Sequence, residues 1–177
     1  MLRKGNEHTV SEINIRHERE GDSARISKII ILAFDNEPHA EADVQEAEIV
    51  ELMRTDAALT LSLVAEIGDE IVGHIAFSKV TIDETFIDWY GLAPVSIEPK
   101  YQNQGIGSLL IREGLTLLQE MGAKGCVLLG EPDYYQRFGF KACQQLVLPD
   151  VPAMYFQVLS FNASLPSGTV KYHQVFG

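Results

Sequence analysis

One stretch decides the fold of this chain: Ile97-Glu98-Pro99-Lys100-Tyr101-Gln102-Asn103-Gln104-Gly105-Ile106-Gly107-Ser108-Leu109-Leu110. An apolar strand runs into a glycine-rich turn, and the turn leads directly into a helix with apolar residues three and four positions apart. The first N–H groups of such a helix lack partners, and the helix dipole adds partial positive charge. Gly105 and Gly107 lack the Cβ atom that would hold a ligand away from the backbone. The stretch therefore predicts a phosphate-binding loop made of backbone groups.

Two common phosphate-binding loops do not fit these residues. A Walker loop ends in Gly-Lys-Ser/Thr, whereas Gly107 is followed by Ser108 and Leu109. A dinucleotide fingerprint needs glycine or alanine three residues after its second glycine, where Leu110 stands, and it follows a first strand rather than lying deep in the chain. What remains is Gln-x-x-Gly-x-Gly. Taken alone, this pattern also suits a glycine cap followed by an ordinary helix.

The segments that follow add a second motif. A helix is expected from Gly105 to Met121, ended by Gly122, with one apolar face formed by Ile106, Leu109, Leu110, Leu117, Leu118 and Met121. Next come a short buried strand at Cys126–Leu129 and a short capped helix within residues 131–140. That helix contains Tyr135-Gln136-Arg137-Phe138-Gly139-Phe140.

These two motifs, in this order, resemble those of the GNAT (Gcn5-related N-acetyltransferase) superfamily, whose second motif reads Tyr-x-(Lys/Arg)-x-Gly-Phe. Three segments also look like the YhbS-type group of N-acetyltransferases: residues 92–97, 130–135 and 168–173. The resemblance implies a GNAT acyl-CoA N-acyltransferase fold. It also implies a transferase that uses acetyl-CoA as its acyl-donor cosubstrate.

The hydrophobic pattern predicts a mixed α/β fold, a mostly antiparallel sheet flanked by helices on both faces. The expected elements are a strand at Ile13–Arg16, helices at Ser23–Phe34 and Ala42–Arg54, a hairpin of Leu61–Glu66 with Glu70–Val80, a strand within Thr85–Ile97 interrupted at Pro94, and strand-like segments at Ala153–Phe161 and Gly168–His173. In the hairpin, turned at Gly68-Asp69, we expect Ile71, Gly73, Ile75 and Phe77 on one face.

Length and composition favour one domain. The chain has 177 residues and 46% hydrophobic content, so residues 13–177 are expected to form a single domain after a polar extension, residues 1–12. The longest apolar run, Ile29–Phe34, is too short to span a membrane, and no signal-peptide pattern is present. Cys126 and Cys143 are read as reduced, buried thiols, which favours a cytoplasmic location.

The resemblance also implies ligand contacts. The backbone of Val95, Ser96 and Ile97 is expected to hold the pantetheine arm, because its amides pair with a strand wherever a sheet is splayed. The pyrophosphate is expected on the backbone of Gln102, Asn103, Gln104, Gly105, Ile106, Gly107 and Ser108. Gln102 stands where many relatives carry arginine, and Lys100 is the nearby residue that would supply positive charge.

For catalysis, the resemblance implies that Tyr135, four residues before Gly139, protonates the leaving sulfur, with Tyr134 as the competing candidate. No general base is identified, because Gly130-Glu131-Pro132 stands where many relatives carry asparagine; Glu131 and Glu98 are candidates. Two positions remain open for His74. It lines the acceptor cleft, or it lies on the protein surface, which is the position we expect. The histidines and cysteines show no metal-binding spacing, so no metal is expected.

A net charge of −11 argues against nucleic acid as a partner. Acidic residues gather around the second helix, where they form a solvated face or attract a cationic amine: Glu37, Glu41, Asp43, Glu46, Glu48 and Glu51. The leading hypothesis is transfer of an acetyl group to a primary amine of a small molecule, peptide or protein. The alternative is an acyl-CoA-binding or sensing module. Longer acyl groups, a hydroxyl acceptor, and a monomer or homodimer all stay open.

Overall fold

A computed structural model describes residues 12–34 and 40–176, and of residues 40–45 it describes the backbone only. Most of the expected extension therefore lies outside the described residues. The larger elements follow one another as β1 (Ile13–His17), α1 (Ser23–Phe34), α2 (Ala40–Thr55), β2 (Leu59–Ile67), β3 (Glu70–Lys79), β5 (Trp89–Ile97), α3 (Ile106–Glu120), β6 (Gly125–Leu129), α4 (Pro132–Tyr135), β9 (Phe156–Ser160) and β10 (Gly168–Lys171). Three short strands complete the set: β4 (Thr81–Ile82), β7 (Lys141–Ala142) and β8 (Leu146–Val147). No described helix is long and apolar enough to cross a membrane.

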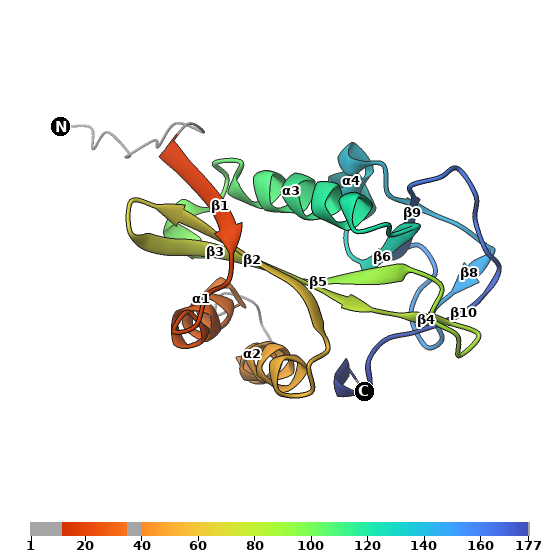
Figure 1. The fold of residues 1–177 in the computed structure, drawn as a ribbon, viewed down its shortest axis with the longest axis horizontal. Coiled ribbons are helices and arrows are strands. Elements are labelled where there is room, and N and C mark those ends of the chain that lie inside the picture. The colour runs from red at the N-terminus through yellow and green to blue at the C-terminus, as the bar shows by residue number, and fades with distance from the viewer. Residues whose placement is uncertain (1–11, 35–39, 177) are drawn as a thin grey trace.

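The main sheet has seven strands in the order β1-β2-β3-β5-β6-β9-β7, and a small sheet has the order β4-β10-β8. Within the main sheet, neighbouring strands are antiparallel except β5 and β6, which run parallel. Helices α1 and α2 cover one face, and α3 and α4 cover the other (Figure 1). The arrangement confirms the predicted mixed α/β, mostly antiparallel fold.

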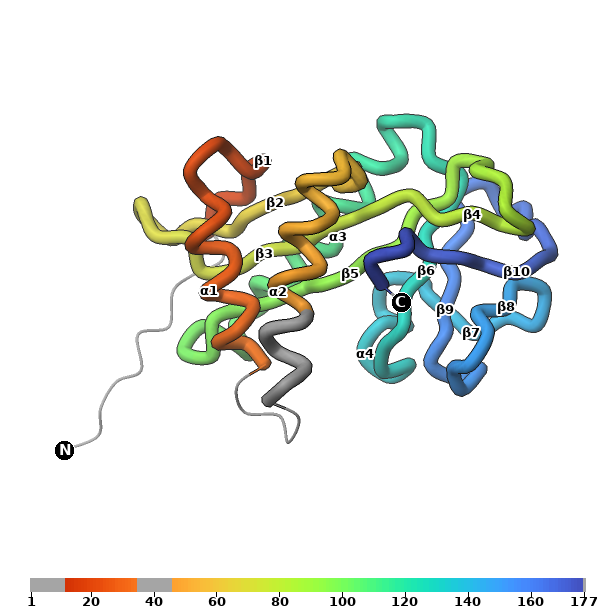
Figure 2. The backbone as a smooth tube through the Cα atoms, turned by 90° about the horizontal axis from the view of Figure 1, so that it is seen from below, coloured from red at the N-terminus to blue at the C-terminus, as the bar shows by residue number. Residues whose placement is uncertain are grey.

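Helices α1 and α2 pack side by side across β2 and β3 (Figure 2). Helix α1 forms where it was predicted, and its Ile26, Ile29 and Ile30 are fully buried. They share one apolar cluster with Val50 and Met53 of α2. Burial of this face removes both helices from water on one side and fixes them on the sheet.

The predicted hairpin forms, but its predicted face is wrong at one residue. The β2–β3 register shifts between the pairs Ala65–Gly73 and Glu66–Ile71, which is a β-bulge. Because an extra residue reverses the alternation of side chains, Ile71 packs with the α1–α2 cluster. Val72 takes its place in the cluster under α3.

Helix α3 follows the predicted pattern closely. Ile106, Leu110 and Leu118 are buried, while Met121 is 53% exposed, so its predicted place in the apolar face is wrong. Met121 is the C-cap residue, just before Gly122 with φ 88°, and the chain has already turned away from the sheet there. Both cysteines are free: Cys126 is buried and Cys143 is half-buried.

The pairing between β5 and β6 is short. It covers only Trp89–Gly91 against Gly125–Val127; beyond it β5 stays paired with β3, and β6 with β9. A register shift on β5 leaves Ala93 and Pro94 unpaired between Leu92 and Val95. From Leu92 onward, the β6-facing edge of β5 therefore offers backbone groups that no β6 strand residue satisfies.

Candidate active site

A cavity of about 720 Å³ adjoins the point where β5 and β6 separate. Its walls include residues 92–95 of β5, Leu129 at the end of β6 and Tyr135 of α4. Glu46 of α2 and the segments 148–151 and 169–172 complete much of the remaining wall. The volume suits a small molecule or the end of a peptide.

Tyr135 is half-buried and lines this cavity, as do Pro94 and Val95. Burial, with a smaller contribution from Tyr134, raises the pKa of Tyr135 to about 12. The phenol therefore stays protonated at neutral pH and can donate a hydrogen bond. A Cβ atom on Gly130 would lie 2.8 Å from Cδ2 of the Tyr135 ring, so a side chain there would displace the tyrosine. The departure from asparagine at this position thus has a packing reason.

Tyr134 points to a different place. Its hydroxyl lies over the first turn of α3, where a Cβ on Gly107 would come within 3.3 Å of it. The two tyrosine rings are nearly perpendicular, with centroids 4.9 Å apart. The Arg137 guanidinium stacks 4.6 Å from the centre of the Tyr134 ring. Tyr134 therefore lies over the glycine loop, whereas Tyr135 lines the cavity.

The loop before α3 has the backbone shape expected of an anion site. After a 3₁₀ turn at Pro99–Tyr101, Asn103 (φ 62°) and Gly105 (φ 84°) adopt left-handed conformations. Such residues turn successive N–H groups toward one side. Gly105 is the N-cap of α3; no side chain caps the helix, and its first turn contains no acidic residue. No atom lies within 4 Å of a Cβ placed on Gly105, so the space above the loop is open.

Two glutamines hold the loop in place. Gln102 Nε2 donates to the Ile97 carbonyl over 3.0 Å, and Gln104 Nε2 donates to the Lys100 carbonyl over 3.4 Å. Lys100 lies 3.7 Å from a Glu98 oxygen and 3.9 Å from a Glu70 oxygen. The carboxylates of Glu98 and Glu70 therefore offset the positive charge of Lys100, which we expected from the sequence to attract the phosphates. Ile106 is buried in the core, and Ser108 is half-buried in the first turn of α3.

The three residues expected beside pantetheine lie along the unpaired edge of β5. Val95 and Ile97 are half-buried against the cluster under α3, and Val95 also lines the cavity. Ser96 is 2% exposed and lies opposite His74 in the β3–β5 ladder. Its side chain belongs to the other face of the sheet, so only its backbone is available to a ligand in the opening.

The expected surface position of His74 is wrong. The ring is fully buried, and its Nε2 lies 2.8 Å from Ser62 Oγ. Burial, and to a lesser extent the charge of Arg54, lowers the pKa of His74 to about 3. The alternation of β3 places this histidine under α1 and α2, which the strand pattern alone does not reveal. His74 is a neutral core residue and does not line the cavity.

The candidate bases are found in different surroundings. Glu98 pairs with Arg25 over 2.7 Å, and Glu131 is exposed at the N-cap of α4; neither lines the cavity. Of the acidic residues around α2, Glu37 and the side chains of Glu41 and Asp43 lie outside the described part of the chain. Glu48 is exposed, Glu51 pairs with Arg54, and Glu46 reaches the cavity.

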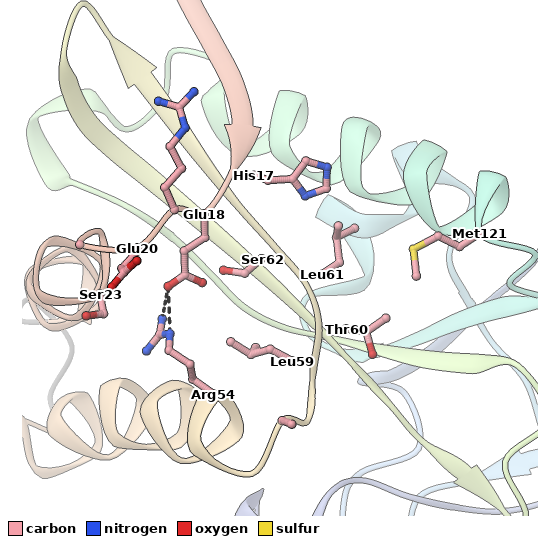
Figure 3. Close-up of a pocket in the computed structure, with 13 residues that line it drawn as sticks. His17, Glu18, Glu20, Ser23, Arg54, Leu59, Thr60, Leu61, Ser62 and Met121 are labelled. Atoms are coloured by element: carbon pink, nitrogen blue, oxygen red, sulfur yellow. Dashed lines mark hydrogen bonds and ion pairs between the residues drawn. The ribbon is translucent and has the colours of Figure 1, made fainter.

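A second cavity, of about 590 Å³, lies between the end of β1, the start of α1 and the end of α2 (Figure 3). Arg54 Nε donates to Glu18 over 2.9 Å across it. The positive charge of Arg54 and the negative charge of Glu18 therefore neutralise each other in this cavity. None of the described residues that line this cavity belongs to the loop or the tyrosine motif. The first cavity is therefore the candidate active site.

Sequence reasoning did not find several parts of the cavity wall. Tyr172 and Phe176 lie well beyond the second motif in the chain, and the segment 148–151 follows that motif without belonging to it. Parallel pairing of β5 with β6, and of β10 with β8, brings them together. No local pattern marks these residues, because their role depends on the topology.

Comparison with known proteins agrees with this geometry. A family model described as "Acetyltransferase (GNAT) domain" matches residues 59–142, which include both motifs. The N-acetyltransferase YhbS of Escherichia coli (strain K12) is 36% identical over 128 residues, 72% of each chain. A crystal structure of a GNAT family acetyltransferase from Brucella melitensis in complex with acetyl-CoA shares 47% identity, with a TM-score of 0.83 over 93% of this chain and 98% of that one. YhbS from Escherichia coli in complex with CoA shares 33% identity, with a TM-score of 0.83 over 93% and 92%.

The chain belongs to the GNAT family, and it is an acetyltransferase. Among its relatives it is similar to the YhbS-type N-acetyltransferases, as residues 92–97, 130–135 and 168–173 indicate.

Proposed function

We propose that this protein transfers the acetyl group of acetyl-CoA to a primary amine by direct attack of the amine on the thioester. One observation carries the proposal: Tyr135 and the unpaired edge of β5 meet at a single cavity. The phosphate-type loop follows directly at the end of the same strand. The Brucella melitensis relative with acetyl-CoA and the YhbS relative with CoA support this choice of donor.

In this proposal the backbone of residues 102–108 binds the pyrophosphate, and the α3 dipole adds to the attraction. The free backbone groups of Val95, Ser96 and Ile97 pair with the amides of the pantetheine arm. Such pairing orients the thioester at the mouth of the cavity. Holding both reactants in place supplies a large part of the rate enhancement in a two-substrate transfer.

Acetyl-CoA supplies the carbonyl carbon that the amine attacks. A backbone N–H near Val95 or Ser96 stabilises the negative charge that develops on the carbonyl oxygen. Tyr135 donates a hydrogen bond to the sulfur as the C–S bond breaks. Since burial raises its pKa to about 12, the hydroxyl keeps its proton until that moment.

The direct test is acetyl-CoA binding by calorimetry, together with CoA release over a panel of small amines, peptides with free N-termini and lysine peptides. We expect micromolar-range binding and amine-dependent release of CoA. Tight binding without turnover on any acceptor would favour the acyl-CoA-binding or sensing module instead. Absence of acetyl-CoA binding would contradict both functions.

The adjacent tyrosines provide a matched pair of variants. We expect Tyr135→Phe to lower kcat by roughly ten- to a thousandfold with nearly unchanged acetyl-CoA affinity, because the hydroxyl acts only as sulfur leaves. Tyr134→Phe removes the same atom from a ring that faces Gly107 and should change kcat much less. Equal effects, or greater damage from Tyr134→Phe, would refute the assignment of Tyr135 as the acid.

A further inference from the structure

Glu46 occupies an unusual position for a carboxylate. On α2 it lies four and seven residues before Val50 and Met53, both of which are buried at 1% and 0% exposure, so it shares their side of the helix. Its side chain is half-buried and lines the same cavity as Tyr135. An acidic residue on the inward side of an amphipathic helix is expected to have a partner.

No such partner is present among the described residues. No hydrogen bond or ion pair joins Glu46 to residues 12–34 or 46–176. Burial alone raises the pKa of its carboxyl group. The other described charged residues that line the cavity, Asp150 and Lys171, are exposed and of opposite sign. Glu46 is therefore a half-buried carboxylate without a described partner in this cavity, and titratable groups with shifted pKa values occur preferentially at functional sites.

We propose that Glu46 is the catalytic base that binds the ammonium group of the acceptor and removes its proton, and that the acceptor is a monoamine with an apolar body. This inference rests on the proposed function and extends it to the acceptor side of the cavity. Neither Glu131 nor Glu98 can take this role from its present position, because Glu131 is exposed at the N-cap of α4 and Glu98 is paired with Arg25.

The proton transfers balance with this residue. The ammonium N–H bond breaks, the proton passes to a Glu46 oxygen, and the lone pair left on nitrogen attacks the carbonyl carbon. As the new C–N bond forms and the C–S bond breaks, Tyr135 gives its hydroxyl proton to the departing sulfur, which leaves as the thiol, and the second amine proton passes through water to the Tyr135 oxygen and restores its hydroxyl group. Glu46 then releases its proton to solvent. Burial favours the neutral form of each group, so it raises the pKa of the Glu46 carboxyl group and lowers the pKa of the bound amine. The two pKa values therefore lie closer together in the cavity than in water.

The walls indicate the rest of the acceptor. Phe34, Phe176, Pro94, Leu148 and Val151 line the same cavity as Glu46 and give much of its wall an aromatic and aliphatic surface. A polyamine would lose the hydration of a second ammonium group wherever that group lay against these side chains, and the other described carboxylate of the wall, Asp150, is exposed and shares the wall with the oppositely charged Lys171. A sugar amine would bury several hydroxyl groups there. An acceptor with a single amine on an aromatic or branched aliphatic body pairs its ammonium group with Glu46 and packs its apolar body against the walls.

The test compares the wild type with Glu46→Gln, Glu46→Asp and the control Glu48→Gln, which changes an exposed residue of the same helix. Release of CoA is measured from pH 6 to pH 10 with 2-phenylethylamine, spermidine and glucosamine. Acetyl-CoA affinity and thermal stability are measured for every variant. The other titratable groups that line the cavity, Tyr135, Asp150, Lys171 and Tyr172, are the same in all four proteins.

We expect Glu46→Gln to lower kcat/KM for 2-phenylethylamine by about a hundredfold or more at neutral pH, with unchanged acetyl-CoA affinity. Only free amine can react in this variant, so its kcat/KM should rise about tenfold per pH unit up to the pKa of the amine. The wild type should show a plateau instead. Glu46→Asp should retain part of the activity, and Glu48→Gln should match the wild type. The melting temperature of Glu46→Gln should be unchanged or higher, because a buried charge is removed.

The outcomes separate the two proposals. If the wild type acetylates 2-phenylethylamine and Glu46→Gln does so equally well, with the same pH plateau, Glu46 is not the base. A preference of the wild type for spermidine or glucosamine overturns the apolar acceptor. A wild type that binds acetyl-CoA and acetylates no amine contradicts the proposed function itself. A Glu46→Gln variant with a lower melting temperature and parallel losses at every pH would assign Glu46 a structural role.

Discussion

His74 and Glu46 are both titratable side chains withdrawn from water, and they differ in what surrounds them. His74 is fully buried with Ser62 as its hydrogen-bond partner and stays neutral. Glu46 is half-buried in a cavity without a described partner. The surface position expected for His74 from the sequence is wrong, whereas the place of Glu46 in the cavity wall is compatible with one of the two roles left open for the acidic residues of the second helix, that of attracting a cationic amine. The alternation of side chains along β3 shows that His74 and Phe77 lie on opposite faces of the sheet. Only the packing of α1 and α2 shows that the face with His74 is also shielded from water.

The buried histidine makes stability depend on pH. Its pKa is about 3 in the folded protein against 6.5 in the unfolded chain. Below pH 6.5 the unfolded chain therefore binds a proton that the folded protein does not, and stability falls as the pH decreases toward 3. The loss from this group approaches about 1.4 kcal/mol per pH unit.

We expect His74→Gln, which keeps a hydrogen-bonding group, to weaken this dependence. Urea unfolding at pH 7.5, 6.5 and 5.5 would measure it, with the exposed His17→Gln as the control. The free energy of unfolding should fall more steeply toward pH 5.5 in the wild type and in His17→Gln than in His74→Gln. Identical slopes in all three proteins would show that His74 does not carry this dependence.

The glycine loop and α3 are the part of the molecule that local sequence predicts best. The positions of Gly105 and Gly122 mark both ends of the helix, and the spacing predicts the buried Ile106, Leu110 and Leu118, although it misses the buried Ile111 and Leu115. The β-bulge that moves Ile71 to the other face has no such signal. It depends on pairing with β2, and register is a property of two strands rather than one.

Gly105 and Gly122 allow the binding role of the loop to be separated from backbone strain. Both have positive φ, 84° and 88°, and in both a Cβ would meet no atom within 4 Å. Gly105→Ala and Gly122→Ala should therefore destabilise the protein similarly, by about 1–2 kcal/mol. Only Gly105→Ala places a methyl group above the proposed pyrophosphate site.

We expect Gly105→Ala to weaken CoA binding about tenfold or more while Gly122→Ala binds like the wild type. Calorimetry with CoA measures the affinity, and urea unfolding measures the stability of each variant. Wild-type CoA affinity in both variants would refute the loop assignment. An equal loss in both would indicate that strain in α3, rather than contact with the ligand, controls binding.

At the scale of the whole molecule, the site is a product of topology. Residues of α2, β5, α4 and the C-terminal segment meet at one cavity, although most of the chain separates the first from the last. The sequence motifs predict the donor side because the loop and the tyrosine helix are local. The acceptor side needs the parallel β5–β6 pair and the small sheet to bring α2 and residues 169–172 together.

The separation of β5 from β6 leads to a last prediction. Amides on the β6-facing edge of residues 92–97 lack a strand partner, so their hydrogen exchange should be fast in the free protein. Bound CoA should slow exchange in this segment strongly, because its pantetheine arm would supply the missing partners. Strand β2, which pairs with β3 and over residues 63–67 also with β1, should change much less.

Mass spectrometry of exchanged peptides tests this, with the nucleotide half of CoA as the control ligand. That fragment occupies the proposed loop but has no pantetheine arm, so it should leave residues 92–97 in fast exchange. If CoA slows both segments in proportion, binding stabilises the fold as a whole and gives no support for strand-like pairing. If the nucleotide fragment protects residues 92–97 as well as CoA does, the arm lies elsewhere, and Val95, Ser96 and Ile97 lose their proposed role.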